Sequence, residues 1–126
     1  MKDFPEHYKE INAWTKKLGL VVPDVMQGFG MLHKPAIKPG ALDSKTKELI
    51  ALGIAVTVRC DGCISFHVHD AMKAGASKEE IAETVSVAIL MGGGPSVMYG
   101  IEAMQVLSQY EEQGFPELMS VTLSFR

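Results

Sequence analysis

The stretch Cys60-Asp61-Gly62-Cys63-Ile64-Ser65-Phe66-His67 holds both cysteines of the chain and one of its four histidines. In a helix, Cys60 and Cys63 stand three positions apart and Cys63 and His67 four apart, so the three side chains share one face. Helical neighbours at this spacing lie roughly 5–6 Å apart, which is within the range that a disulfide can bridge. The spacing therefore predicts a pair that can cycle between dithiol and disulfide.

Length and composition indicate one soluble domain. At 126 residues the chain has the usual size of a single domain, and we expect residues 1–126 to form one all-helical unit. The longest uncharged apolar run, Leu49–Val58, is far shorter than the ~20 residues of a membrane span. Met1–His7 mixes charges and lacks the apolar core of a secretory signal, so we expect a cytoplasmic protein without a membrane partner.

The net charge and the expected cellular compartment narrow the range of possible functions further. A net charge of −3 without a Lys/Arg cluster argues against nucleic-acid binding. In a reducing compartment, two closely spaced cysteines favour redox or metal chemistry over a stabilising bridge.

The first third of the chain predicts two helices and a loop. Phe4–Leu18 carries apolar residues at steps of three or four, the pattern of an amphipathic helix, and Gly19 is well placed to end it. Asp24–Leu32 repeats the pattern more weakly and predicts a short helix. His33–Gly40, with two prolines and a glycine, is expected to be a loop.

Asp43 or Ser44 can cap the next helix, which contains the apolar run Leu49–Val58. Its second half is apolar on every side and needs neighbours on several sides, so another subunit is expected to supply some of them. We therefore expect a homo-oligomer. A strand over Ile54–Val58 is the alternative, because three of these five residues are β-branched.

The remaining segments also predict helices. The cysteine helix is expected to run to Ala74 and to be ended by Gly75, and Ser77-Lys78-Glu79-Glu80 is a capping box that opens another helix. Gly92–Ser96 interrupts the pattern before a last helix that reaches about Gln113, and the tail beyond Phe115 is predicted to be loose or to take part in subunit contacts. The expected inward positions are Ile81, Thr84, Val85, Ala88 and Ile89, then Val97, Ile101, Met104 and either Val106 or Leu107. The predicted class is all-α, with five to seven helices.

A redox thiol reacts as the thiolate, so it needs a helix N-terminus, a cation or a base nearby. A helix that begins at Asp61 or just before it leaves both cysteines beside its first turn, where the helix dipole favours negative charge. His67 lies one turn beyond Cys63 and can take up its proton. Glu48, on the preceding helix, is the candidate to hold that histidine.

Glu48, followed twelve residues later by Cys60-x-x-Cys63-x-x-x-His67 and then by Ala74-Gly75-Ala76, resembles the core of the AhpD-like alkylhydroperoxidases of the carboxymuconolactone decarboxylase superfamily. The likeness covers roughly residues 40–110. It implies an all-helical fold that assembles into trimers or hexamers.

The resemblance also implies a peroxide-reducing cycle that needs neither cofactor nor metal. Cys63 attacks a small hydroperoxide, becomes a sulfenic acid and condenses with Cys60 into a disulfide. Glu48 and His67, with a bridging water, form the proton relay, and a dithiol or a protein reductant regenerates the pair. One departure is visible, because well-studied members carry a second histidine where this chain has Gly62. Decarboxylases of the superfamily generally lack the cysteine pair, which argues against lactone decarboxylation.

Other interpretations of the same residues remain open. The cysteines can be inert core residues, or a non-catalytic oligomeric sensor or binding protein can use the pair to record redox state. Glu48, Cys60, Cys63 and His67 can together ligate zinc. A thioredoxin-like protein would need the strand at Ile54–Val58 and a proline, Pro95, facing the thiols. His69 points roughly 160° away from His67 on a helix, and we expect it at the surface.

Overall fold

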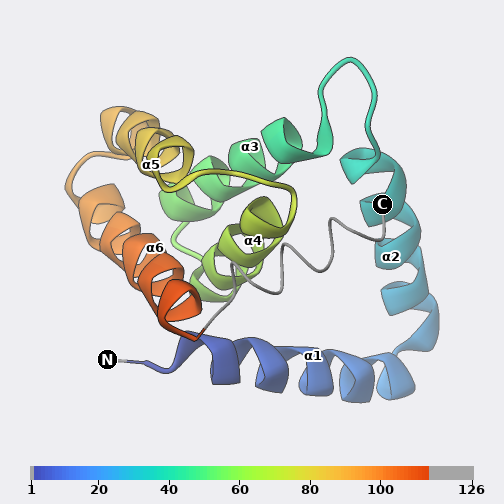
Figure 1. Ribbon diagram of the computed structural model, residues 1–126. Helices are drawn as coiled ribbons and strands as arrows, with labels where there is room; N and C mark the ends of the chain where they lie inside the picture. The colour runs from blue at the N-terminus through green and yellow to red at the C-terminus, as the bar shows by residue number, and fades with distance from the viewer. Residues whose placement is uncertain (1, 114–126) are drawn as a thin grey trace.

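The computed structural model describes residues 2–113, which form six helices and contain no strand (Figure 1). The helices are α1 (Phe4–Val21), α2 (Pro23–Ile37), α3 (Ser44–Thr57), α4 (Asp61–Lys73), α5 (Lys78–Gly92) and α6 (Gly94–Glu112). The predicted all-α class is confirmed. The strand alternative over Ile54–Val58 is wrong, because α3 runs through this stretch to Thr57, and a thioredoxin-like sheet has no basis in the described residues. The tail beyond Phe115 lies outside them.

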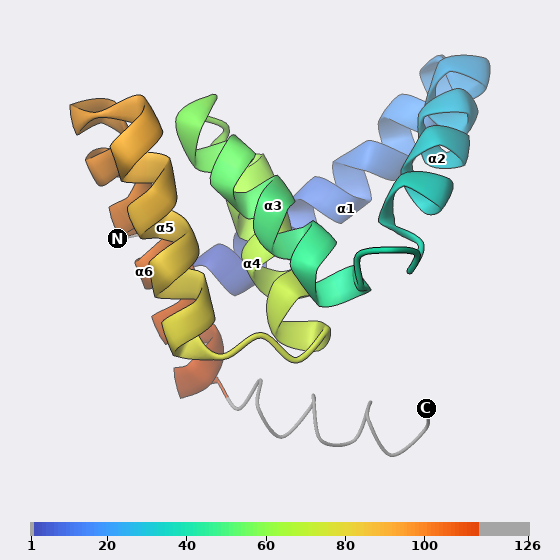
Figure 2. The same ribbon diagram turned by 90° about the horizontal axis from the view of Figure 1, so that it is seen from above.

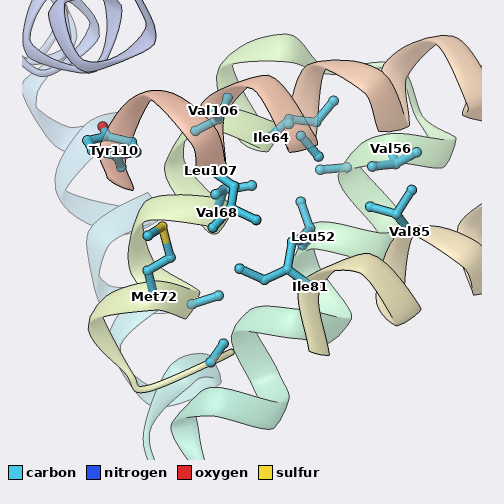
Figure 3. Close-up of a cluster of buried hydrophobic side chains, with 14 of the residues drawn as sticks. Leu52, Val56, Ile64, Val68, Met72, Ile81, Val85, Val106, Leu107 and Tyr110 are labelled. Atoms are coloured by element: carbon cyan, nitrogen blue, oxygen red, sulfur yellow. The ribbon is translucent and has the colours of Figure 1, made fainter. Parts of the chain in front are cut away.

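Four helices, α3 to α6, form the body of the molecule. Helix α4 packs between α3 and α6, and α5 covers the outer side of α3 and α6 (Figures 1 and 2). The side chains between these helices form the core that Figure 3 shows, and its fully buried members include Leu52, Val56, Ile64, Val68, Ile81 and Val106. No helix among the described residues has the length and apolar character of a bilayer span.

In the middle of the chain, the residues that were predicted to begin or end helices do so. Asp43 caps α3 by accepting a hydrogen bond from Thr46 N at 2.8 Å. Ser77 and Glu80 form the predicted capping box of α5. Gly75 has φ 97°, the left-handed conformation that glycine adopts without strain, and it ends α4 as predicted.

Two predicted boundaries in the N-terminal third are wrong. Gly19 does not end α1, which continues to Val21 and stops because Pro23 restricts the residue before it. The loop expected to begin at His33 begins only after Ile37, because α2 continues through Pro35. Pro35 lacks the N–H that would bond to the preceding turn, but Lys38 N still donates to Lys34 O at 3.1 Å and completes the end of the helix.

Helix α1 joins the body through its first half. Phe4 is 1% exposed, and the side chain of the buried Gln109 holds this end by accepting from Phe4 N at 2.7 Å and donating to Lys2 O at 2.6 Å. The predicted apolar stripe then leaves the core, because Trp14 is 65% exposed and no residue of α2 is buried. Residues 14–37, the apolar arm, stand away from the body in Figure 2.

The inward face of α6 differs from the prediction. Val97 and Ile101 are exposed, whereas Ser96, Gly100, Ala103, Val106, Leu107 and Tyr110 are buried. Small residues on this face let α6 approach α5 closely. A Cβ atom at Gly100 would come within 2.6 Å of Cγ1 of Val85. The pattern of large apolar residues therefore marked the wrong side of the first turns of α6.

Candidate active site

A tight turn between α3 and α4 places the first cysteine. Arg59 adopts the left-handed conformation, with φ 62°, which is uncommon for a residue with a side chain. Arg59 N donates to Val56 O at 3.3 Å and Cys60 N donates to Ala55 O at 3.1 Å, the pair of bonds that closes a helix in a Schellman motif. Cys60 therefore ends the closing turn of α3 and is also the residue that begins α4.

The two cysteines lie in the first turn of α4, as predicted. Cys60 is the N-cap, and its Sγ accepts a hydrogen bond from Cys63 N at 3.3 Å. The pair forms a disulfide, with the two Cα atoms 5.2 Å apart. Cys63 is exposed and Cys60 half-buried, so Cys63 is the sulfur that a molecule from solvent reaches more readily.

Glu48 and His67 form the second half of the site. Oε1 of Glu48 lies 2.8 Å from Nδ1 of His67, and the Glu48 residue is 5% exposed. The packing of α3 against α4 creates this contact across nineteen positions of sequence. Because a carboxylate only accepts, His67 donates through Nδ1, which leaves Nε2 as the nitrogen that can take up a proton. The side chain of His67 is 21% exposed, so the ring lies at the edge of the core.

A charged pair lies at the beginning of α4. Asp61, the first residue of the helix, accepts a 2.5 Å hydrogen bond from Nζ of Lys2. This bond, opposed in part by burial, holds the pKa of the Asp61 carboxyl below its ordinary value. The contact ties the N-terminal segment to the turn that carries the cysteines.

Helix α1 passes next to the glycine between the cysteines. Cδ1 of Ile11 would lie 3.5 Å from a Cβ atom at Gly62, so α1 crosses directly over this position. The position at which well-studied relatives carry a second histidine therefore borders α1 at Ile11 in this chain.

Sequence reasoning placed His69 wrongly and missed Asp70. His69 is not at the surface: its side chain is 17% exposed, its Nδ1 lies 2.9 Å from Oδ1 of Asp70, and its ring stacks on Tyr8 at 4.2 Å between centroids. The prediction failed because α1 covers the side of α4 that points away from the core. Asp70 follows His67 by three positions, and this helical spacing was the available signal.

Three side chains of the site have the chemistry to hold a metal ion. One ligand atom each from Glu48, His67 and Asp70 lies within 4.8 Å of the others. The zinc set considered from the sequence also required thiolates, and the sulfurs of Cys60 and Cys63 are joined to each other in the disulfide form.

Comparison with known proteins identifies the family. The model of the carboxymuconolactone decarboxylase family matches residues 23–106. An uncharacterized protein of Cupriavidus necator is 38% identical over 102 residues, which are 81% of this chain and 90% of the relative. An uncharacterized protein of Haemophilus influenzae is 39% identical over 106 residues, which are 84% and 94% of the two chains.

Solved structures agree with this assignment. A carboxymuconolactone decarboxylase family protein from Legionella pneumophila is 44% identical, with a TM-score of 0.81 over 85% of this chain and 96% of its own. One from Thermotoga maritima, for which a part in the antioxidative response has been suggested, is 34% identical, with a TM-score of 0.67 over 71% and 93%. The chain belongs to the carboxymuconolactone decarboxylase family.

Proposed function

We propose that the protein is a thiol-dependent peroxidase of the alkylhydroperoxidase kind, or a disulfide oxidoreductase that uses the same cysteine pair. The observation that carries the proposal is the disulfide between Cys60 and Cys63 at the beginning of α4, one turn from a histidine that a buried carboxylate holds. The suggested antioxidative role of the Thermotoga relative supports the same direction.

The first step is deprotonation and attack. The Cys63 thiol gives its proton to Nε2 of His67, whose Nδ1–H stays bonded to Glu48. The thiolate attacks the terminal oxygen of a small hydroperoxide, the O–O bond breaks, and sulfur loses two electrons. The leaving alkoxide takes the proton from His67 and departs as an alcohol, so the relay returns to its starting state.

The second step closes the disulfide. The Cys60 thiol attacks the sulfur of the Cys63 sulfenic acid, and water leaves as the S–S bond forms. The 5.2 Å separation of the Cα atoms allows this without movement of the helix. A dithiol or a protein thiol then reduces the disulfide by exchange, and we place this cycle in the cytoplasm, where such reductants are abundant.

Sustained turnover tests the proposal. The protein is incubated with tert-butyl hydroperoxide and excess dithiothreitol, and peroxide consumption is followed beyond one equivalent per protomer. Consumption of many equivalents, abolished by Cys63→Ser, supports a peroxidase. If the protein does not consume the peroxide but catalyses the reduction of an added disulfide substrate, it is a disulfide oxidoreductase. Oxidation that stops after one equivalent despite the reductant would point to the non-catalytic redox sensor.

We also propose that the chain assembles with copies of itself into a trimer or a hexamer, as its family resemblance implies. The apolar arm exposes large side chains, among them Val25 at 67% and Phe29 at 61%. Helix α2 also contains two glycines, and Pro35 lies within it, so it gains little from intrinsic helix propensity and needs packing against other surfaces.

The body offers complementary apolar surface. A groove of about 420 Å³ between α3 and α5 is lined mainly by apolar side chains, including Ile50, Ile54 and Met91. Because one chain carries both the apolar arm and this groove, copies can cover one another's exposed surfaces.

A further inference from the structure

We propose that Asp70 is a positioning residue of the thiol site, and that His69 and Asp70 form a second imidazole–carboxylate pair that supports the first. The proposal rests on the proposed function, because it assigns these residues a part in activating Cys63. It deepens that function by assigning two further residues to the site of a chain that has Gly62 where well-studied relatives carry a second histidine.

The geometry joins the two pairs. Asp70 lies three positions after His67 on α4, so both side chains project from neighbouring points of one face. One ligand atom of Asp70 lies within 4.8 Å of one atom each of His67 and Glu48. Two hydrogen bonds of about 2.8 Å through one water span such a distance, so the groups can interact directly or through a single water.

His69 fixes the Asp70 carboxylate in place. Its Nδ1 lies 2.9 Å from Oδ1 of Asp70. Its ring stacks on Tyr8 of α1 and meets Tyr110 of α6 edge-on, with centroids 5.4 Å apart. Rings from two other helices, α1 and α6, therefore hold His69, and both helices pack against α4.

The negative charge of Asp70 affects the pKa values of two neighbouring tyrosines. Burial first, and then the Asp70 carboxylate, raise the pKa of the Tyr8 hydroxyl. The pKa of Tyr110 is raised by burial and by the neighbouring charges of Tyr8, Asp70 and Asp3. The charged and titratable groups around Asp70 are Glu48 from α3, Tyr8 from α1, Tyr110 from α6, and His67, His69 and Lys73 on α4 itself, while Asp3 before α1 acts on Tyr110.

The sign of the effect follows from Coulomb's law. A negative charge near His67 favours the imidazolium that forms when Cys63 gives up its proton. Replacing Asp70 with asparagine removes that charge and keeps the shape. Near neutral pH, Cys63 should then react about three- to tenfold more slowly. At about pH 10 the thiol ionises without the histidine, so the two proteins should react at similar rates.

The experiment measures the thiol directly, without a peroxide. In a Cys60→Ser background only Cys63 carries a thiol, and its alkylation by iodoacetamide is followed from about pH 6 to pH 10. Asp70→Asn should slow alkylation near neutrality and converge with the parent at high pH. His69→Gln should act in the same direction with a smaller effect. Asp70→Glu should restore most of the rate, and Asp24→Asn, at an exposed position of α2, should change nothing.

The outcomes separate this proposal from the peroxidase function. Equal alkylation rates for Asp70→Asn and its parent near neutral pH would overturn it, and so would a slowing of the same size at every pH, which would indicate structural damage. Circular dichroism checks that each variant is folded. If the wild-type protein forms no disulfide with hydroperoxide, the peroxidase function fails while alkylation still decides the role of Asp70.

Discussion

Oε1 of Glu48 on α3 lies 2.8 Å from Nδ1 of His67 on α4, in a place where Glu48 is 5% exposed. A buried carboxylate is costly unless it is paired, so this bond both satisfies Glu48 and orients the imidazole. The orientation leaves Nε2 of His67 to receive a proton. Helix packing thus prepares a base on the same helix as the two cysteines, before any substrate arrives.

Glu48→Gln tests that relationship. The amide keeps the size of the side chain but removes the charge that stabilises the imidazolium, so disulfide formation by hydroperoxide should slow about a hundredfold. The free energy of unfolding in urea should change by only about 1 kcal/mol, because the amide can still accept the bond. Stopped-flow measurement on reduced protein gives the rate. Glu10→Gln, at an exposed position of α1, is the control, and a variant at Glu48 as fast as this control would remove Glu48 from the mechanism.

The capping role of Cys60 predicts a difference between two variants. Cys60→Ser and Cys60→Ala both lack the disulfide, but only serine can accept the bond that Cys63 N donates. Under reducing conditions the alanine variant should therefore unfold with a free energy about 1 kcal/mol lower than the serine variant. Urea titrations followed by circular dichroism provide the comparison. Equal stabilities would show that the cap contributes nothing.

Close packing of α5 and α6 makes Gly100 intolerant of a larger residue. In Gly100→Ala the new methyl group meets Cγ1 of Val85 at 2.6 Å, and the overpacking should cost about 1–3 kcal/mol. Gly28→Ala is the matched control, because no atom lies within 4 Å of its new Cβ and the helix gains about 0.5–1 kcal/mol. Both are measured by urea unfolding at one protein concentration. A neutral Gly100→Ala would mean that the two helices can separate at little cost.

Assembly is tested at the groove between α3 and α5. Ile54 lines this groove and is 56% exposed, so Ile54→Glu places a charge where a second copy is expected to dock. Sedimentation equilibrium should give a trimer or hexamer for the wild type and a smaller species for this variant. Lys9→Glu adds a negative charge at an exposed position outside the groove and should leave the mass unchanged. A wild-type monomer would contradict the assembly.

The features that could be predicted from the sequence are those that depend on residues close together in the chain. Asp43, Ser77 and Gly75 lie at the helix ends that they were expected to mark, because capping depends on residues within one turn. The three-and-four spacing of Cys60, Cys63 and His67 predicted that one helix carries all three, and α4 with its N-cap Cys60 does so. Glu48 was proposed as the partner of His67 from its place on the preceding helix, and the 2.8 Å contact between them depends on how the two helices pack.

The wrong predictions concern which helix faces are covered by other helices. An apolar stripe predicts a helix but does not say what covers it, so Val97 was expected inside and is exposed, and the stripe of α1 is exposed at Trp14. His69 was placed at the surface because the angle between residues on a helix says nothing about α1, which packs on that side. Pro35 stands within α2, although a proline inside a helix lacks the N–H that would bond to the preceding turn. Correct predictions of these features would have required knowledge of how distant parts of the chain pack together.

The most direct measurement is the titration of fully reduced protein with one equivalent of tert-butyl hydroperoxide, followed by intact-mass spectrometry without reductant. The wild-type chain should lose two hydrogens as Cys60 and Cys63 join. Cys63→Ser should keep its mass, and Cys60→Ser should gain one oxygen as the sulfenic acid on Cys63. A wild-type protein whose mass is unchanged, with both thiols still free after the titration, would contradict the proposed reaction of the cysteine pair with hydroperoxide.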